Sequence, residues 1–397
     1  MIGSKEFEFH KENPSFYGGD RLGRIKKEKV RRAMETNNLD VLLLFATPSV
    51  RYVTDFFPKG YRAYAQDLEY LAVVPLDGEP ILGYSSGSDE YRVKVRCQVE
   101  DARKLPPHSK WPEAIAQILK DYDLVKARIG VDMLYFDMYM SLKKLVPNAR
   151  FETATRIWTD ITAIKHPIEI EYIKKATDIT AEGVRAAIGA IRDGVREYEV
   201  AAASEYALRM AGTEVQFGIL QVASGKNSAI FERIATEKAI RNGELVMLDV
   251  CALYRGYQGD LARTVICGEP TKRQKEIFNV QMGSLKEATE AIRPGVKCSE
   301  VDAVARNYIA RSRYGKYMHK FATGHQLGYG VHGEPLIAQG VEEPLKPNMV
   351  VCLEPRVHLY DQWEVGGVTN EDAILVTKTG AEILSQKLEY DEKLLDI

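Results

Sequence analysis

The sequence predicts two domains: an α/β domain over residues 1–160, followed by an α+β domain over residues 161–397. A chain of 397 residues is too long for one ordinary domain. Short apolar strands alternate with helical stretches in the first part, and a helix–turn–helix pattern occurs twice in the second. With 45% hydrophobic and 28% charged residues, the composition is that of a globular protein with ample material for a core.

The first domain shows its strands as short apolar runs. Residues 41–45 (VLLLF) and 128–132 (RIGVD) are expected to be buried strands, and residues 68–84 form strand-like runs around a turn. Residues 112–122 have the periodicity of a helix. Alternating strands and helices indicate an α/β layer. This part contains no glycine-rich phosphate loop and no cluster of His or Cys, so we expect it to be structural or to supply contacts to another part.

The second domain is expected to begin near residue 161. Pro167 stands where a long amphipathic helix over residues 169–192 should start. The segment 190–200 (AIRDGVREYEV) recurs as 291–301 (AIRPGVKCSEV), and each copy ends one helix at a turn glycine and starts another. Two similar halves packed about a pseudo-twofold axis would leave a groove in which a site can form.

Composition excludes several classes of protein. The formal net charge is −2 with both signs spread along the chain, so no nucleic-acid surface is expected. The five cysteines are scattered and form no CxxC pair, which is typical of reduced thiols in a cytoplasmic protein. Cys251 and Cys352 are expected to pack as small apolar residues. There is no signal-peptide core and no run of membrane-spanning length, so we expect a cytoplasmic protein without a membrane partner.

A predicted β-hairpin carries two carboxylates. Residues 245–251 (LVMLDVC) and 259–264 (GDLART) are apolar strands joined by a connection containing Arg255-Gly256-Tyr257. Asp249 lies within the first strand and Asp260 opens the second. A buried carboxylate without a partner is costly. For a single Asp, a strand-end residue that hydrogen-bonds the turn is the simpler interpretation, and a metal ion is the alternative.

Further along the chain, two more acids and a histidine favour the metal site over the strand-end interpretation. Glu354 ends an apolar strand, Glu371 precedes another, and His325 stands among small residues. Capping alone does not explain so many misplaced acids. Four carboxylates and one imidazole are the donor set of a site for two divalent cations, and shared carboxylates would relieve their mutual repulsion.

With these residues the chain resembles the pita-bread metallopeptidase family, which includes prolidase, aminopeptidase P, methionine aminopeptidase and the metal-free relative creatinase. The family's ligand order Asp, Asp, His, Glu, Glu is matched in full. The matching residues are Asp249, Asp260, His325, Glu354 and Glu371. The resemblance covers the second half, and residues 52–56 (YVTDF) extend it to the N-terminal domain. It implies a creatinase-like α/β N-terminal domain followed by a pita-bread α+β catalytic domain.

The resemblance also implies an activity, that of a dinuclear metal-dependent hydrolase of a peptide or amide C–N bond, most similar to Xaa-Pro dipeptidases. It implies two divalent ions per chain, with Mn²⁺ first and Co²⁺, Zn²⁺ or Fe²⁺ as alternatives, and a homodimer. Glu354 would both bind metal and relay a proton to the leaving nitrogen. His332 would hydrogen-bond the substrate carbonyl or the tetrahedral intermediate. The other interpretation of His332 is a turn histidine satisfied by backbone.

The sequence departs from the peptidase pattern at two positions. The Pro-His pair expected in Xaa-Pro peptidases is Phe231-Glu232, and the expected Arg followed by an aliphatic residue is Thr369-Asn370. Glu232 would repel a substrate carboxylate and attract a cation. Alternatively it forms a surface ion pair with Arg233. The substrate, a dipeptide or another small molecule, is therefore left open.

Arg62 lies in a loop, residues 57–62 (FPKGYR), that resembles one reaching the partner's active site in dimeric relatives. An Arg suits bidentate recognition of a substrate carboxylate. The alternative is a surface pair with Asp67 or Glu69.

Three other functions are weighed against the hydrolase. A metal-dependent lyase of the same fold would act on a sulfonium or other cationic small molecule, and is expected to carry an acid in place of His332. A non-catalytic pita-bread binding module would lose the metal ligands, which are all present here. A creatinase-type amidinohydrolase would need no metal, and the retained ligands argue against it.

Overall fold

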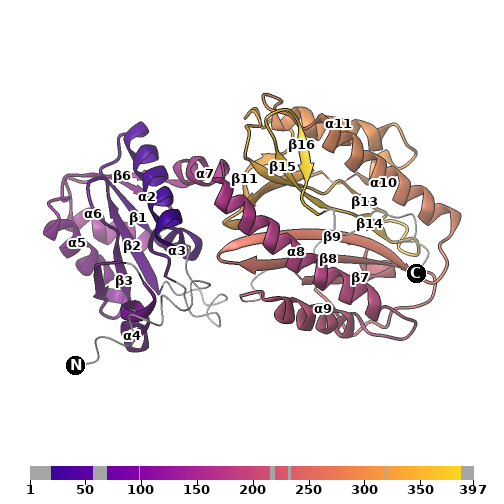
Figure 1. The fold of residues 1–397 in the computed structure, drawn as a ribbon, viewed down its shortest axis with the longest axis horizontal. Helices are drawn as coiled ribbons and strands as arrows, with labels where there is room; N and C mark the ends of the chain where they lie inside the picture. The colour runs from indigo at the N-terminus through magenta and orange to yellow at the C-terminus, as the bar shows by residue number, and fades with distance from the viewer. Residues whose placement is uncertain are drawn as a thin grey trace. The chain divides into compact units, whose positions relative to one another are not determined.

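The computed structural model describes residues 19–56, 69–97, 99–214, 220–230, 234–318 and 320–385. The chain divides into two compact units, Met1–Thr162 and Ala163–Ile397, whose elements are labelled in Figure 1. None of the helices within the described ranges is long and apolar enough to cross a membrane.

A mixed six-stranded sheet lies at the centre of the first unit, in the order β4-β3-β2-β1-β5-β6. The pairs β1–β2 and β2–β3 are antiparallel and the others are parallel. The central strand β1 is buried along its whole length, as its unbroken apolar sequence predicted. The strands are β1 (Val41–Leu44), β2 (Tyr70–Pro75), β3 (Ile81–Tyr84), β4 (Asp101–Lys104), β5 (Arg128–Val131) and β6 (Arg150–Thr153).

Helices pack against this sheet through apolar faces. The buried face of α5 is formed by Trp111, Ile115, Ile118 and Leu119, whose spacing places them on one side of a helix. The α/β character predicted for this unit is therefore confirmed. Its helices are α2 (Gly19–Thr36), α3 (Thr47–Thr54), α4 (Gly87–Arg96), η3 (His108–Lys110), α5 (Trp111–Asp121), α6 (Phe136–Leu145) and α7 (Thr155–Ala163), the last ending in the second unit.

The first half of the second unit joins two helices to an antiparallel sheet in the order β7-β8-β9. Pro167 begins the first helix, since proline fits the first helical position. The His166 ring accepts a hydrogen bond from Ile168 N (3.2 Å), and the Glu169 carboxylate accepts one from His166 N (2.8 Å). The elements are α8 (Pro167–Ala190), α9 (Glu197–Ala211), β7 (Leu220–Ser224), η4 (Gly225–Asn227), β8 (Glu244–Tyr254) and β9 (Tyr257–Cys267).

A two-residue turn joins β8 and β9. Arg255 and Gly256 have φ angles of 51° and 84°, and two positive values are what the tight hairpin turn requires. The hairpin was predicted, but its connection is shorter than the sequence suggested. Tyr257 belongs to β9, where it pairs with Tyr254.

The second half has the same plan on a larger sheet in the order β11-β10-β12-β15-β16, with β13 and β14 forming a separate two-stranded ribbon. Its elements are α10 (Lys272–Ala291), α11 (Cys298–Ala310), η5 (Gly315–Tyr317), β10 (Gly324–Gly328), β11 (Gly330–Ile337), β12 (Val350–Leu353), β13 (Arg356–His358), β14 (Gly367–Thr369), β15 (Asp372–Val376) and β16 (Ala381–Ile383).

The helix pairs of the two halves follow the duplicated sequence segment. In the first half α8 ends at Ala190 and α9 begins at Glu197, while in the second α10 ends at Ala291 and α11 begins at Cys298. Each pair has its own apolar core against its own sheet. Figure 1 shows α8 crossing in front of β8 and β9, α9 below these strands, and α10 and α11 above them. The predicted pairing of two similar halves is therefore present.

Candidate metal centre

Five predicted site residues converge in the second unit, and all of them are buried. The first half contributes Asp249 from β8 and Asp260 from β9. The second half contributes His325 from β10, Glu354 immediately after β12, and Glu371 immediately before β15.

Strand register explains why these side chains meet. Alternate residues of a strand point to one face, and directly opposed residues of an antiparallel pair share that face. Cys251 is opposite Asp260 and lies two residues after Asp249, so the two aspartates face the same side of the hairpin. In the other sheet, His325 is opposite Cys352.

Backbone hydrogen bonds fix the two glutamates at the ends of their strands. Glu354 N donates to Thr323 O (2.8 Å), and Glu371 N donates to Ala262 O (2.9 Å). The Gln281 side chain on α10 donates to Pro355 O (2.7 Å) and to Asn370 O (2.9 Å). One side chain thus holds the residue after Glu354 and the residue before Glu371. Gln281 was not predicted to support the site, because its only signal in the sequence is a polar residue on the buried face of a helix.

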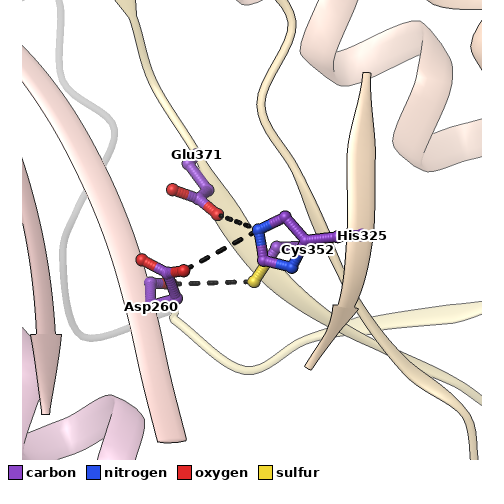
Figure 2. Close-up of side chains that lie close together, drawn as sticks. All are labelled: Asp260, His325, Cys352 and Glu371. Carbon is purple, nitrogen blue, oxygen red and sulfur yellow. Dashed lines mark hydrogen bonds and ion pairs between the residues drawn. The ribbon is translucent and has the colours of Figure 1, made fainter. Parts of the chain in front are cut away.

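The distances around His325 fit a shared cation. Its Nε2 lies 3.7 Å from Asp260 Oδ2, 3.7 Å from Glu354 Oε1 and 3.6 Å from Glu371 Oε1. These are too long for hydrogen bonds but suit donors arranged around one ion. Glu371 Oε1 is buried, and no hydrogen bond reaches it from the described part of the chain. Figure 2 shows the His325 imidazole and the carboxylates of Asp260 and Glu371 turned toward one another.

The electrostatics of the cluster also call for positive charge. Burial, and after it the neighbouring carboxylates, raise the pKa of Asp249, Asp260 and Glu371 well above the ordinary range. For Asp249 those neighbours are Asp260 and Glu354. A bound divalent cation removes the repulsion and compensates the desolvation. The donor set and its charge therefore fit a metal centre.

Polar side chains next to the cluster hold its members in place. Gln221, opposite Asp249 on β7, donates to Asp249 Oδ2 at 3.2 Å. The buried Arg263 guanidinium donates to the backbone oxygen of Glu371 at 2.5 Å and to Asp372 Oδ1 at 3.0 Å. Arg263 therefore links β9, which carries Asp260, to the segment that carries Glu371.

Arg356 is a second residue that the sequence analysis did not identify. It is 3% exposed, and its Nη2 donates to Glu354 Oε2. Arg356 on β13 is directly opposite Thr369 on β14. The guanidinium expected from the resemblance at position 369 is thus carried by the facing residue of the neighbouring strand. The Thr369 hydroxyl instead pairs with His358 Nε2 at 2.8 Å.

His332 lies beside the cluster, as predicted. Its ring centroid is 4.5 Å from that of His325, with the rings at 66°. Its side chain is exposed to solvent, yet enough protein surrounds the ring for desolvation, aided by His325, to lower its pKa. The position suits contact with a substrate. The two other predicted substrate contacts, Glu232 and Arg62, lie outside the described residues.

Comparison with known proteins identifies the family. Residues 171–378 match metallopeptidase family M24, and residues 26–161 match the creatinase/prolidase N-terminal domain. The Xaa-Pro dipeptidase of Pyrococcus horikoshii is 33% identical over 368 residues, covering 91% of this chain and 98% of that protein. The Xaa-Pro dipeptidase of Pyrococcus furiosus is 33% identical over 362 residues, covering 90% and 97%.

The solved structures agree with the sequence matches. The crystal structure of prolidase from Pyrococcus horikoshii OT3 has a TM-score of 0.80 at 30% identity, over 93% of this chain and 99% of that one. The chain belongs to metallopeptidase family M24. It is a metal-dependent hydrolase with a pita-bread catalytic domain after a creatinase/prolidase N-terminal domain, which confirms the predicted family, fold and enzyme class.

Proposed function

We propose that this chain is a dinuclear metal-dependent dipeptidase that hydrolyses the C–N bond of Xaa-Pro or similar dipeptides. The observation that carries the proposal is the convergence of four buried carboxylates and one imidazole from five strands or strand ends. The two Pyrococcus relatives, both named Xaa-Pro dipeptidase, support the substrate class.

In this proposal Asp249, Asp260, His325, Glu354 and Glu371 hold the metal pair. Asp260 is the expected shared ligand, because its carboxylate belongs to two groups of neighbouring donors. One group contains Asp249, and the other contains His325 and Glu371. When bound, two divalent ions supply the Lewis acidity that polarises a carbonyl and makes water more acidic. An oxygen-rich donor set with one imidazole accepts Mn²⁺, our first candidate, as well as Co²⁺, Zn²⁺ or Fe²⁺.

Protein side chains then move the proton and position the substrate. Glu354 takes a proton from the attacking water on a carboxylate oxygen and delivers it to the leaving nitrogen. Arg356, bonded to Glu354 Oε2, keeps that carboxylate oriented. His332, exposed beside His325, donates a ring N–H to the substrate carbonyl oxygen as negative charge develops there.

We extend the proposal to organisation and location. The catalytic domain is placed at residues 161–397 and the N-terminal domain at residues 1–160, which is supported by an N-terminal match ending at residue 161. A homodimer in which Arg62 reaches the partner's site is expected from the resemblance. A cytoplasmic location is supported by the five cysteines, all of them free.

Removing a ligand tests the metal centre. Asp260→Ala and Glu354→Ala are each expected to abolish metal binding and turnover, because each takes a charged donor from a buried cluster. The matched control is Asp361→Ala, which removes an exposed acid paired with Lys316. Metal content by mass spectrometry and hydrolysis of an Xaa-Pro dipeptide are measured for each variant. Full activity in either ligand variant would refute the dinuclear mechanism.

Glu232 is proposed to set substrate preference. A carboxylate at this position repels the free carboxylate of a dipeptide, so Glu232→His is expected to increase kcat/KM for Xaa-Pro dipeptides. Glu237→His provides a control at a nearby acid. If Glu232→His leaves the rate unchanged, Glu232 does not determine specificity.

A further inference from the structure

We propose that the thiols of Cys251 and Cys352 are additional metal donors, so that this centre prefers a thiophilic divalent cation such as Zn²⁺ to Mn²⁺, the first candidate for the five oxygen and nitrogen ligands alone. The inference rests on the proposed function for the location of the centre, and deepens it by naming donors beyond the five predicted ligands. It replaces the expectation that both cysteines serve only as small apolar residues.

Cys352 lies within the predicted ligand set. Ligand atoms of Asp260, His325, Cys352 and Glu371 all lie within 4.8 Å of one another, and all four residues are buried. In Figure 2 the sulfur lies between the aspartate and the imidazole. Strand register places it there, because Cys352 is directly opposite His325 and lies two residues before Glu354, on the same side of the strand.

Cys251 occupies the corresponding place in the other half. It lies two residues after Asp249 and directly opposite Asp260, and its Sγ donates to Asp260 Oδ1 at 3.1 Å. Asp249, Cys251 and Asp260 form a second buried group of donors within 4.8 Å. Each half therefore brings one thiol to the side of its sheet on which its ligand carboxylates lie.

The resulting donor set differs from one of oxygen and nitrogen alone. Carboxylate and water donors suit Mn²⁺ or Mg²⁺, whereas thiolate and imidazole favour Zn²⁺. Zinc accepts Cys, His and Asp or Glu together at bond lengths of about 2.0–2.3 Å. On binding, the S–H bond breaks, a sulfur–metal bond forms, and the proton leaves to solvent. Without a cation, burial and the neighbouring carboxylates raise the pKa of both thiols, so the proton leaves only when a cation bound between the carboxylates supplies compensating positive charge.

Cobalt substitution provides a direct test, because Co²⁺ adopts zinc sites and a sulfur–cobalt bond absorbs in the near ultraviolet. The full chain, reduced with a phosphine, is titrated with Co²⁺ as wild type, Cys251→Ser, Cys352→Ser and the double variant. Cys298→Ser is the control, since Cys298 is fully buried in the apolar core of α11 and lies outside both donor groups. The charge-transfer band is expected in the wild type and control, weaker in each single variant and absent in the double variant.

Metal selectivity provides a second measurement. It would not change if Cys251 and Cys352 had a purely structural role. Loss of the thiols is expected to weaken Cd²⁺ and Zn²⁺ binding by more than the roughly 10- to 100-fold that follows loss of a residue merely supporting a ligand, while Mn²⁺ affinity is retained. Bound Co²⁺ without the band, a band that survives in the double variant, or equal loss of Mn²⁺ and Cd²⁺ affinity would overturn the inference.

The outcomes separate this inference from the proposed function. Cleavage of Xaa-Pro dipeptides by a chain whose bound Co²⁺ shows no sulfur band refutes the thiol ligands alone. A sulfur band in a chain that cleaves no dipeptide refutes the proposed substrate alone. A wild type that binds no Co²⁺ refutes both.

Discussion

Arg356 brings a positive charge into a cluster of buried carboxylates. Its side chain is 4% exposed and that of its partner Glu354 is 7% exposed. A buried carboxylate that loses its ion-pair partner is strongly destabilising. Arg356 is directly opposite Thr369, so the Cβ atoms of the two residues are neighbours on one face of the β13–β14 ribbon. An arginine at either position can therefore place its guanidinium in the same region.

The first prediction concerns this pair. Arg356→Ala is expected to lower the free energy of unfolding of the metal-free protein by roughly 3 kcal/mol, because Glu354 remains buried without its partner. Adding Thr369→Arg to that variant should restore a large part of the loss. Urea unfolding in the presence of a chelator measures both effects. Equal stability of Arg356→Ala and wild type, or no recovery in the double variant, would contradict the assigned role.

Single residues also show which parts of the site can be predicted from the sequence. The five proposed ligands could be singled out because each acid lies within or next to an apolar strand, His325 stands among small residues, and their order matches that of the family which the chain resembles. Gln281, Arg356 and Cys352 were not predicted to contact the site. Their contacts depend on the register of strands and helices far apart in the chain, which periodicity within one segment does not determine.

At the scale of elements, helix α8 lies against strand β9 at Gly259, next to Asp260. A Cβ at Gly259 would come within 2.4 Å of the backbone carbon of Ala176. The close approach therefore depends on the missing side chain. It holds the strand that carries Asp260 directly against the helix behind it.

Gly259→Ala is expected to push α8 away from β9, lower the free energy of unfolding by about 1–3 kcal/mol, and reduce turnover. Gly189→Ala is the matched control, because a Cβ there meets nothing within 4 Å and alanine favours the helix by up to about 1 kcal/mol. Thermal unfolding and dipeptide hydrolysis are compared for the two variants. If Gly259→Ala proves as stable as Gly189→Ala, the close contact is not required.

Long periodic elements could be predicted and short ones could not. The β8–β9 hairpin and α8 have unbroken apolar or amphipathic patterns, and Pro167 marks the start of the helix. The ribbon of β13 and β14 has strands of three residues, too few to show alternation. Assigning Tyr257 to the turn was wrong because a glycine signals a turn without fixing which neighbour begins the strand.

At the scale of the catalytic unit, the predicted ligands come from both halves. Asp249 and Asp260 belong to the first helix–sheet layer, and His325, Glu354 and Glu371 to the second. The duplicated segment predicted two halves with a site between them, but not which strands would meet. The proposed metal pair, held by residues of both halves, would connect the two halves, so we expect metal binding and folding stability to be coupled.

Metal should therefore stabilise the fold. At a free-metal concentration of about 100 times Kd, binding to the native state adds about 2.7 kcal/mol, so Tm is expected to rise with added Mn²⁺ or Zn²⁺ and to fall with a chelator. Asp260→Ala should show little of this shift. A wild-type Tm that ignores both metal and chelator would mean that the buried carboxylates are not a metal centre.

The most direct test of the central claim is metal analysis of the purified wild-type protein, combined with hydrolysis of Xaa-Pro dipeptides after metal loading. We expect about two divalent ions per chain, as in a two-metal site, and dipeptide cleavage that a chelator abolishes. A protein that binds no divalent metal, or that cleaves dipeptides equally well in the presence of chelator, would contradict it.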